Sequence, residues 1–268
     1  IAWERSTGRI LSPAIVWQDR RATTQTEALR DAGHEHEVQQ TTGLILDPYF
    51  SAGKMHWALT HLPEVRKAAD AGNLCFGTVD SWLLWKLTGG ELHGTDSSNA
   101  ARTSLMDLEA GAWSPQMAKL FAVPPEALPA ILPTSGALAE TRLFGRAIPI
   151  TGMAGDQQAA AIGQACLHAG RAKCTYGTGI FLLANAGGAP PLSRHRLLAT
   201  WLASDPRSYA LEGSIFVGGD AVKWLRDGLG IVDAAAETEA MARSVPDSGG
   251  VAFVPAFAGL GASHWQPM

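Results

Sequence analysis

Residues 148–164 (IPITGMAGDQQAAAIGQ) constrain the fold most, because within a few positions the pattern changes from strand to helix. Residues 148–151 favour a short strand, and Gly152 and Gly155 permit a tight turn. The alanine-rich residues 159–165 favour a helix whose small side chains face a close neighbour. The sequence therefore predicts a strand, a glycine turn and a helix in direct succession.

Asp156 and Gln157 stand where this predicted helix begins. A carboxylate at that place is stabilised by the unpaired amides of the first helical turn and is held in one direction. Two interpretations remain open. Asp156 is either an N-cap with no further role or a functional group presented at the end of a strand.

Composition excludes several classes of function. The chain has 268 residues, of which 46% are hydrophobic and 17% charged, enough for about two domains with a substantial core. Its net charge of -4 does not indicate a nucleic-acid or anionic-membrane partner. No apolar run reaches membrane length, and no signal-peptide layout is present. Cys75, Cys166 and Cys174 have no paired spacing, which predicts reduced thiols and a cytoplasmic location.

The first third of the chain predicts alternating strands and helices. Residues 2–4 and 9–11 flank a Ser-Thr-Gly turn typical of a hairpin, and Pro13–Trp17 favours the next strand. Asp19 and Arg20 follow this strand, as ligand groups often do in α/β proteins, although a solvated ion pair is equally compatible. We expect helices at residues 23–32, 51–62 and 63–71, and another within residues 78–90 that is capped by Thr78 and stopped by glycine.

The remaining segments predict surface connections followed by a second sheet. Thr95–Ala100 favours a polar surface turn, and residues 172–184 favour two strands around a Thr-x-Gly-Thr-Gly turn. Such a turn can expose amides to a phosphate, but an ordinary hairpin has the same pattern. We expect further strands at 209–216 and 249–255, with glycines leading from the first into a helix. The histidines show no metal-binding spacing.

Seven motifs in register resemble the FGGY carbohydrate kinases, and most closely the members that phosphorylate glycerol. These motifs are Trp17-Gln-Asp-Arg-Arg, Asp47-Pro-Tyr-Phe-Ser, Thr78-Val-Asp-Ser-Trp-Leu-Leu-Trp-Lys-Leu-Thr, Gly155-Asp-Gln-Gln-Ala-Ala, Thr175-Tyr-Gly-Thr-Gly, Ala210-Leu-Glu-Gly-Ser and Val254-Pro-Ala-Phe-Ala-Gly-Leu-Gly-Ala. They cover the chain nearly from end to end.

The resemblance implies an α/β, actin-like and ribonuclease H-like two-domain fold. It places most of the first domain at residues 1–164 and the start of the nucleotide-binding domain at 165–268. It also implies that glycerol and ATP, with Mg²⁺, bind in the cleft between the domains and give sn-glycerol 3-phosphate. A homo-oligomer remains open.

The resemblance also assigns site residues. Asp156 matches the base that accepts the proton of the attacking hydroxyl, and Tyr49 and Gln157 match polyol-binding groups. Trp17 and Phe181 match the apolar walls against the carbon side of glycerol. The residues that match nucleotide contacts are Thr178, Gly219 and Lys223, the last standing where some family members have Gln.

Other family motifs have no counterpart here. The first phosphate-binding hairpin and an Arg-Glu polyol clamp would precede Ile1, and a glycine-rich adenosine motif would follow Met268. We therefore expect the middle of a longer enzyme, inactive when expressed alone. Two alternatives stay open: a kinase for another polyol or sugar such as xylulose, and a non-catalytic truncated relic.

Overall fold

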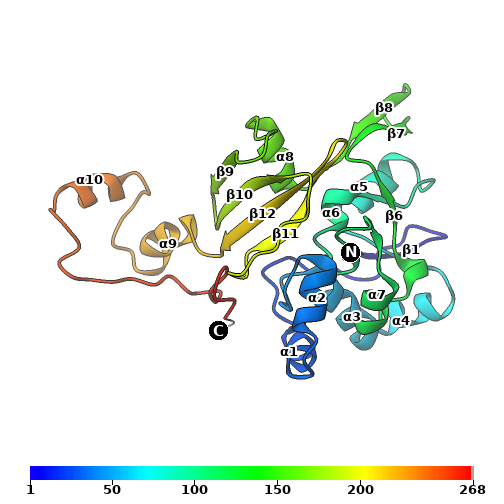
Figure 1. Ribbon diagram of the computed structural model, residues 1–268, viewed down its shortest axis with the longest axis horizontal. Helices are drawn as coiled ribbons and strands as arrows, with labels where there is room; N and C mark the ends of the chain where they lie inside the picture. Colours follow the sequence, from blue (N-terminus) through cyan, green and yellow to red (C-terminus); the bar gives the residue numbers. More distant parts are fainter. Residues whose placement is uncertain (267–268) are drawn as a thin grey trace.

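The computed structural model describes residues 1–266, which form two bodies of mixed α/β structure (Figure 1). A helical body spans residues 1–132, and a sheet body spans residues 156–217; the hairpin of residues 135–152 lies between them in the chain. Beyond the sheet body, an arm carries two short helices away from it before the chain returns, with the Ala262 amide donating to the Ser214 carbonyl at 2.9 Å. Residues 267 and 268, the end of the predicted second domain, lie outside the described residues.

The helices are α1 (Thr23–Asp31), α2 (Glu35–Thr42), α3 (Ser51–His61), α4 (Pro63–Asp70), α5 (Val79–Leu87), α6 (Ser97–Ala100), α7 (Pro115–Leu120), α8 (Asp156–Gly163), α9 (Gly219–Lys223) and α10 (Glu237–Arg243), with a 3₁₀ turn at Pro125–Ala127 and a π-helical turn at Trp224–Gly228. The strands are β1 (Ala2–Glu4), β2 (Leu74–Phe76), β3 (Gly94–Asp96), β4 (Met106–Asp107), β5 (Ala112–Trp113), β6 (Ala130–Leu132), β7 (Ser135–Thr141), β8 (Ile148–Gly152), β9 (Ala172–Tyr176), β10 (Ile180–Gly187), β11 (Leu198–Ser204) and β12 (Arg207–Ile215). The predicted helices at α1, α3, α4 and α5 are confirmed within a residue or two.

The sheet body contains a four-stranded antiparallel sheet in the order β11-β12-β10-β9. The β9–β10 hairpin pairs Tyr176 with Ile180 around the predicted glycine turn, so this prediction is confirmed. Helix α8 packs on the sheet, where its Ala161 lies in one apolar cluster with Leu183 and Leu202. The small alanine side chain lets helix and sheet approach closely, which places the start of α8 beside the sheet.

The helical body is organised around one apolar core. Helix α3 buries Ala52, Met55 and Leu59, positions three or four residues apart that lie on one face of a helix. They pack with Leu74 and Phe76 of β2 and with side chains from α4 and α7. Pro63 starts α4 in the position that tolerates a missing amide hydrogen, so α3 and α4 follow each other almost without a loop.

The two bodies meet along a seam, which we define by contacts of Gly43, Leu108 and Arg102 with the strands β11 and β12. The Ala199 amide donates to the Gly43 carbonyl at 2.9 Å, and the Trp201 indole donates to the Leu108 carbonyl at 2.7 Å. Gly43 ends α2 with φ 73°, and a Cβ there would lie 2.5 Å from the Ala199 carbonyl oxygen. A glycine is therefore required at this position both by its backbone conformation and by the closeness of β11.

Two predicted strands are wrong. Pro13–Trp17 has no strand partner among residues 1–266, and Pro13 has no amide hydrogen to offer one. Residues 249–255 form no strand either, and Val251 and Val254 are exposed. In both places the residues favour a strand, but no neighbouring strand is available. Residues with high β propensity form a strand only when another strand pairs with them.

A predicted surface turn is also wrong. Residues 94–100 form β3 and α6, and Asp96 is fully buried. Its carboxylate caps α6 by accepting hydrogen bonds from the amides of Ser98 and Asn99, each at 2.9 Å. The polar residues satisfy one another inside the protein rather than face water. Thr78, in contrast, makes no side-chain cap bond to α5 and donates to Asp80 instead.

The close approach of β11 to Gly43 predicts that alanine destabilises the protein more at Gly43 than at Gly72. Gly43→Ala and Gly72→Ala both place a side chain at positive φ, but Gly72 (φ 64°) has nothing within 4 Å of the added Cβ. Gly43→Ala should therefore lower the free energy of unfolding by roughly 1 to 3 kcal/mol more than Gly72→Ala, the usual cost of overpacking. Urea unfolding followed by tryptophan fluorescence measures both. Equal losses would show that β11 does not approach Gly43 as described.

Candidate functional site

Three of the predicted site residues line one cavity of about 610 Å³ on the helical body, at its border with the sheet body. Trp17 comes from the segment before α1, Tyr49 from the turn before α3, and Asp156 from the start of α8. All three line this cavity, together with Lys54 and Asn99. Residues that are far apart in the sequence thus face a common space large enough for a small polar molecule.

Asp156 is not an N-cap. Gly155 occupies the cap position, and no side-chain cap bond is present. The Asp156 carboxylate is exposed and accepts a hydrogen bond from the Gln157 amide nitrogen at 3.1 Å. The capping interpretation is therefore wrong, and the carboxylate is free to contact a ligand in the cavity.

The turn that carries Asp156 is anchored on both sides. The Gly155 amide donates to Ser98 Oγ at 2.9 Å, which connects it to α6 of the helical body. Gln158, only 2% exposed, directs its amide nitrogen to the Trp201 carbonyl at 3.3 Å in β11. Because Asp156 lies between these two anchors, its backbone has a fixed position relative to both bodies.

Aromatic side chains form one side of the site. Trp17 makes edge-to-face contacts with Tyr49 at 5.6 Å and with Phe181 at 6.0 Å between ring centroids. Phe216 stacks on Tyr49 at 5.8 Å and completes the group. Phe181 does not itself line the cavity, but its contact with Trp17 crosses from β10 to the helical body. Each such pair contributes about 0.5–1.5 kcal/mol beyond area burial.

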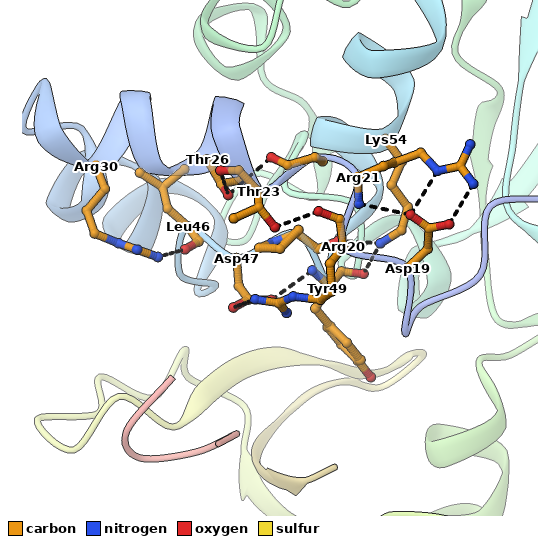
Figure 2. A network of polar contacts seen from close by, with 12 residues as sticks. Asp19, Arg20, Arg21, Thr23, Thr26, Arg30, Leu46, Asp47, Tyr49 and Lys54 are labelled. Carbon is orange, nitrogen blue, oxygen red and sulfur yellow. Dashed lines mark hydrogen bonds and ion pairs between the residues drawn. The ribbon is translucent and has the colours of Figure 1, made fainter. Parts of the chain in front are cut away.

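A polar network holds the turn of Tyr49 (Figure 2). The Asp47 carboxylate accepts from Arg20 Nη1 at 2.9 Å and from the Tyr49 amide at 2.8 Å. Lys54, 7% exposed, donates to the Tyr49 carbonyl at 3.0 Å and also to the Pro48 carbonyl. Figure 2 shows the Tyr49 ring pointing away from these contacts. The network therefore fixes the backbone and leaves the ring free to pack in the site.

The predicted alternative of an Asp19–Arg20 ion pair is not what forms. Asp19 pairs with Arg21 at 2.7 Å, and this partner lowers the pKa of the Asp19 carboxyl. Arg20 pairs instead with the buried Asp47, so it joins the segment that carries Trp17 to the turn that carries Tyr49. Arg20 is thus a structural link between two residues of the site.

Burial shifts two pKa values here. It raises the pKa of Tyr49 to about 12, with the Glu212 charge as the next cause, so the phenol remains a hydrogen-bond donor at neutral pH. Burial also lowers the pKa of Lys54 to about 8, although Asp19 and Asp47 act in the opposite direction.

The residues matched to nucleotide contacts form a separate group that does not line the cavity. The Gly218 amide donates to the Thr178 carbonyl at 2.7 Å, which holds the β9–β10 turn against the start of α9. A Cβ on Gly219 would lie 2.7 Å from the Gly177 carbonyl oxygen, so this approach requires glycine. Lys223 is exposed at the end of α9.

Sequence reasoning missed the buried Glu212 and Lys173 and the half-buried Arg102. Arg102 Nη2 and Glu212 Oε1 lie 2.8 Å apart across the seam, and Lys173 of β9 donates to Gln157. A signal for Glu212 existed, because a carboxylate within the apolar strand pattern of residues 209–216 must have a partner. Lys173 gave no such signal, since it stands among small and polar residues.

The described residues offer no metal centre of their own. Within residues 1–266, no three His, Cys, Asp or Glu side chains gather closely enough to hold a metal ion. All three cysteines are free thiols. In the part of the chain that the structure describes, helices are too short or too polar to span a bilayer.

Comparison with known proteins places the chain among sugar and polyol kinases. The N-terminal domain model of the FGGY family of carbohydrate kinases matches residues 1–163, and the C-terminal domain model matches residues 172–268. The chain is 54% identical over 271 residues to a glycerol kinase of Alkalilimnicola ehrlichii, covering 100% of this chain and 55% of that protein. The chain thus spans about half the length of such relatives.

Solved structures agree with this placement. The Plasmodium falciparum glycerol kinase with ADP superposes with a TM-score of 0.88 at 37% identity, covering 100% of this chain and 54% of that one. The xylulose kinase of Rhodospirillum rubrum has a TM-score of 0.79 at 24% identity over 97% of this chain and 54% of its own, a likeness of fold alone. The predicted α/β fold of this family is confirmed.

Lys54 predicts a measurable pH dependence. Its pKa is lowered in the folded protein, so the unfolded chain binds more protons between about pH 8 and 10.5, and stability rises with pH in this window. The free energy of unfolding should increase by about 1 to 2 kcal/mol from pH 8 to 9.5 relative to Lys54→Met. Urea unfolding of both proteins at the two pH values measures this difference. Parallel pH profiles would show that Lys54 is not buried as described.

Proposed function

Because the chain belongs to the FGGY family of carbohydrate kinases, we propose that it forms part of an ATP-dependent glycerol kinase, which produces sn-glycerol 3-phosphate. The observation that carries this proposal is the convergence of Trp17, Tyr49 and the uncapped Asp156 on one cavity. The exposed Asp156 carboxylate beside the rings of Trp17 and Tyr49 provides a proton acceptor together with a surface for the carbon side of a small polyol.

In the proposed reaction, a glycerol hydroxyl oxygen attacks the γ-phosphorus of ATP, its bond to ADP breaks, and the hydroxyl proton passes to Asp156. Phosphoryl transfer needs little covalent help from the protein, so positioning and charge stabilisation dominate. The two anchors of the Asp156 turn support this role, because they hold the carboxylate at the cavity. Tyr49 and Gln157 bind the remaining hydroxyls. Trp17 forms the apolar wall, and Phe181 packs against it from β10.

The nucleotide is proposed to bind at the β9–β10 turn and the start of α9, through Thr178, Gly219 and Lys223. The close packing of these two turns supports this assignment. Mg²⁺ is proposed to arrive with ATP, since it usually keeps several waters and binds few carboxylates besides the phosphates.

The boundary between the two domains is proposed to lie between residues 164 and 165. The two family domain models support this proposal, because they match residues 1–163 and 172–268. The free cysteines support a reducing cytoplasmic location, which is also part of the proposal.

Asp156→Asn tests the base in the complete enzyme. The substitution keeps the size of the side chain but removes the proton acceptor, so kcat should fall by about 10² to 10⁴ while the fold is retained. Initial rates of glycerol-dependent ADP formation from Mg-ATP measure this. Asp70→Asn, at the exposed end of α4, is the matched control and should keep normal turnover. Near-normal turnover of Asp156→Asn would refute its role.

Phe181→Ala tests the proposed wall and the choice between glycerol and a longer sugar. Loss of the Phe181 ring removes a contact that supports Trp17. We therefore expect transition-state binding of glycerol to weaken by roughly 1 to 3 kcal/mol. The loss of transition-state binding should be smaller for four- and five-carbon polyols. The measurement is kcat/KM for each polyol. An equal loss of kcat/KM for polyols of all chain lengths would contradict the proposed wall. It would favour a kinase for a larger substrate such as xylulose.

A further inference from the structure

Lys173 is a buried lysine that the proposed reaction does not use. It lies on β9 and is only 3% exposed. Its ammonium donates to the Gln157 side-chain oxygen, to Thr175 Oγ1 at 2.9 Å and to the Phe181 carbonyl at 3.4 Å. A lysine ammonium has three donors, and each has an acceptor here. No donor therefore remains for a phosphate group.

The contact with Lys173 determines how the Gln157 amide is turned. An ammonium can only donate, so the side-chain oxygen of Gln157 must face Lys173. The amide nitrogen then faces the other way, where it donates to Asp156 Oδ2 at 3.1 Å. Reversing the amide would set nitrogen against ammonium and oxygen against carboxylate. A chain of two hydrogen bonds thus runs from Lys173 through Gln157 to Asp156.

We propose that Lys173 is a positioning residue, which fixes the amide of Gln157 and through it the carboxylate of Asp156 for attack by a bound polyol. The inference rests on the proposed function. The same ammonium holds the backbone of Phe181, so the carboxylate and the aromatic wall share one anchor. Misplacing a reacting group by about 1 Å can cost about 10²-fold in rate, which is why such an anchor matters.

Two variants of the complete enzyme test whether Lys173 positions Gln157 and Asp156 or acts in another way. Lys173→Met removes every donor at nearly constant volume, whereas Lys173→Gln keeps an amide donor without the charge. We expect Lys173→Met to lower kcat/KM for glycerol about 10- to 100-fold with the KM for Mg-ATP unchanged, and Lys173→Gln to recover part of the loss. Lys119→Met, on the exposed face of α7, is the control and should behave as the wild type.

A second readout does not depend on the substrate. The side-chain amide signals of Gln157 in a nitrogen-15 spectrum can be assigned by their loss in Gln157→Glu. In the wild type they should be sharp, and in Lys173→Met they should shift or broaden because the amide is free to turn. If Lys173→Met does not fold, Lys173→Gln is judged by the same spectrum and the same kinetics.

The outcomes distinguish the two proposals. Unchanged kinetics and unchanged amide signals in an active Lys173→Met enzyme would overturn the positioning role alone. A loss confined to the KM for Mg-ATP would also overturn it, in favour of a direct phosphate contact. If the wild type fails to phosphorylate glycerol but the amide signals still change in Lys173→Met, the proposed function fails and the contact that orients Gln157 stands.

Discussion

The charge pair between Arg102 and Glu212 is the interaction on which the seam depends. Its atoms lie 2.8 Å apart, and the Glu212 side chain is only 1% exposed. Arg102 also lies 5.9 Å from the ring centroid of Tyr49, so the pair supports the aromatic side of the site directly. Removing one partner of such a buried pair usually costs about 3–5 kcal/mol, because the other charge is left uncompensated.

The residues of the site fall into two groups: those that line the cavity, and those that hold the cavity-lining segments in place. Trp17, Tyr49 and Asp156 line the cavity, but none of them fixes its own position. Their segments are held by Arg20, which binds the Asp47 carboxylate, by Lys54, which donates to the Tyr49 carbonyl and also lines the cavity, and by Ser98, which accepts from the Gly155 amide.

The sequence predicts the parts of the fold that local patterns determine. The β9–β10 hairpin and the start of α8 follow from turn glycines and side-chain periodicity, and the structure has them where expected. Pro13–Trp17 fails as a strand because pairing depends on distant residues that no local pattern reveals. The local pattern singles out Asp156, whereas Trp17 and Tyr49 could be proposed only through resemblance to a family. Lys173 could not be found at all, since a buried ammonium looks like a surface lysine until its acceptors are known.

The edge-to-face contact of Trp17 with Phe181 has a thermodynamic consequence. One ring belongs to the helical body and the other to the sheet body, so a ligand resting on this pair is bound only while the bodies are docked. By linkage, occupancy and docking must then favour each other, and a ligand at 100 times its dissociation constant adds about 2.7 kcal/mol to the docked state. A ligand bound at this pair would therefore stabilise the docked arrangement of the two bodies.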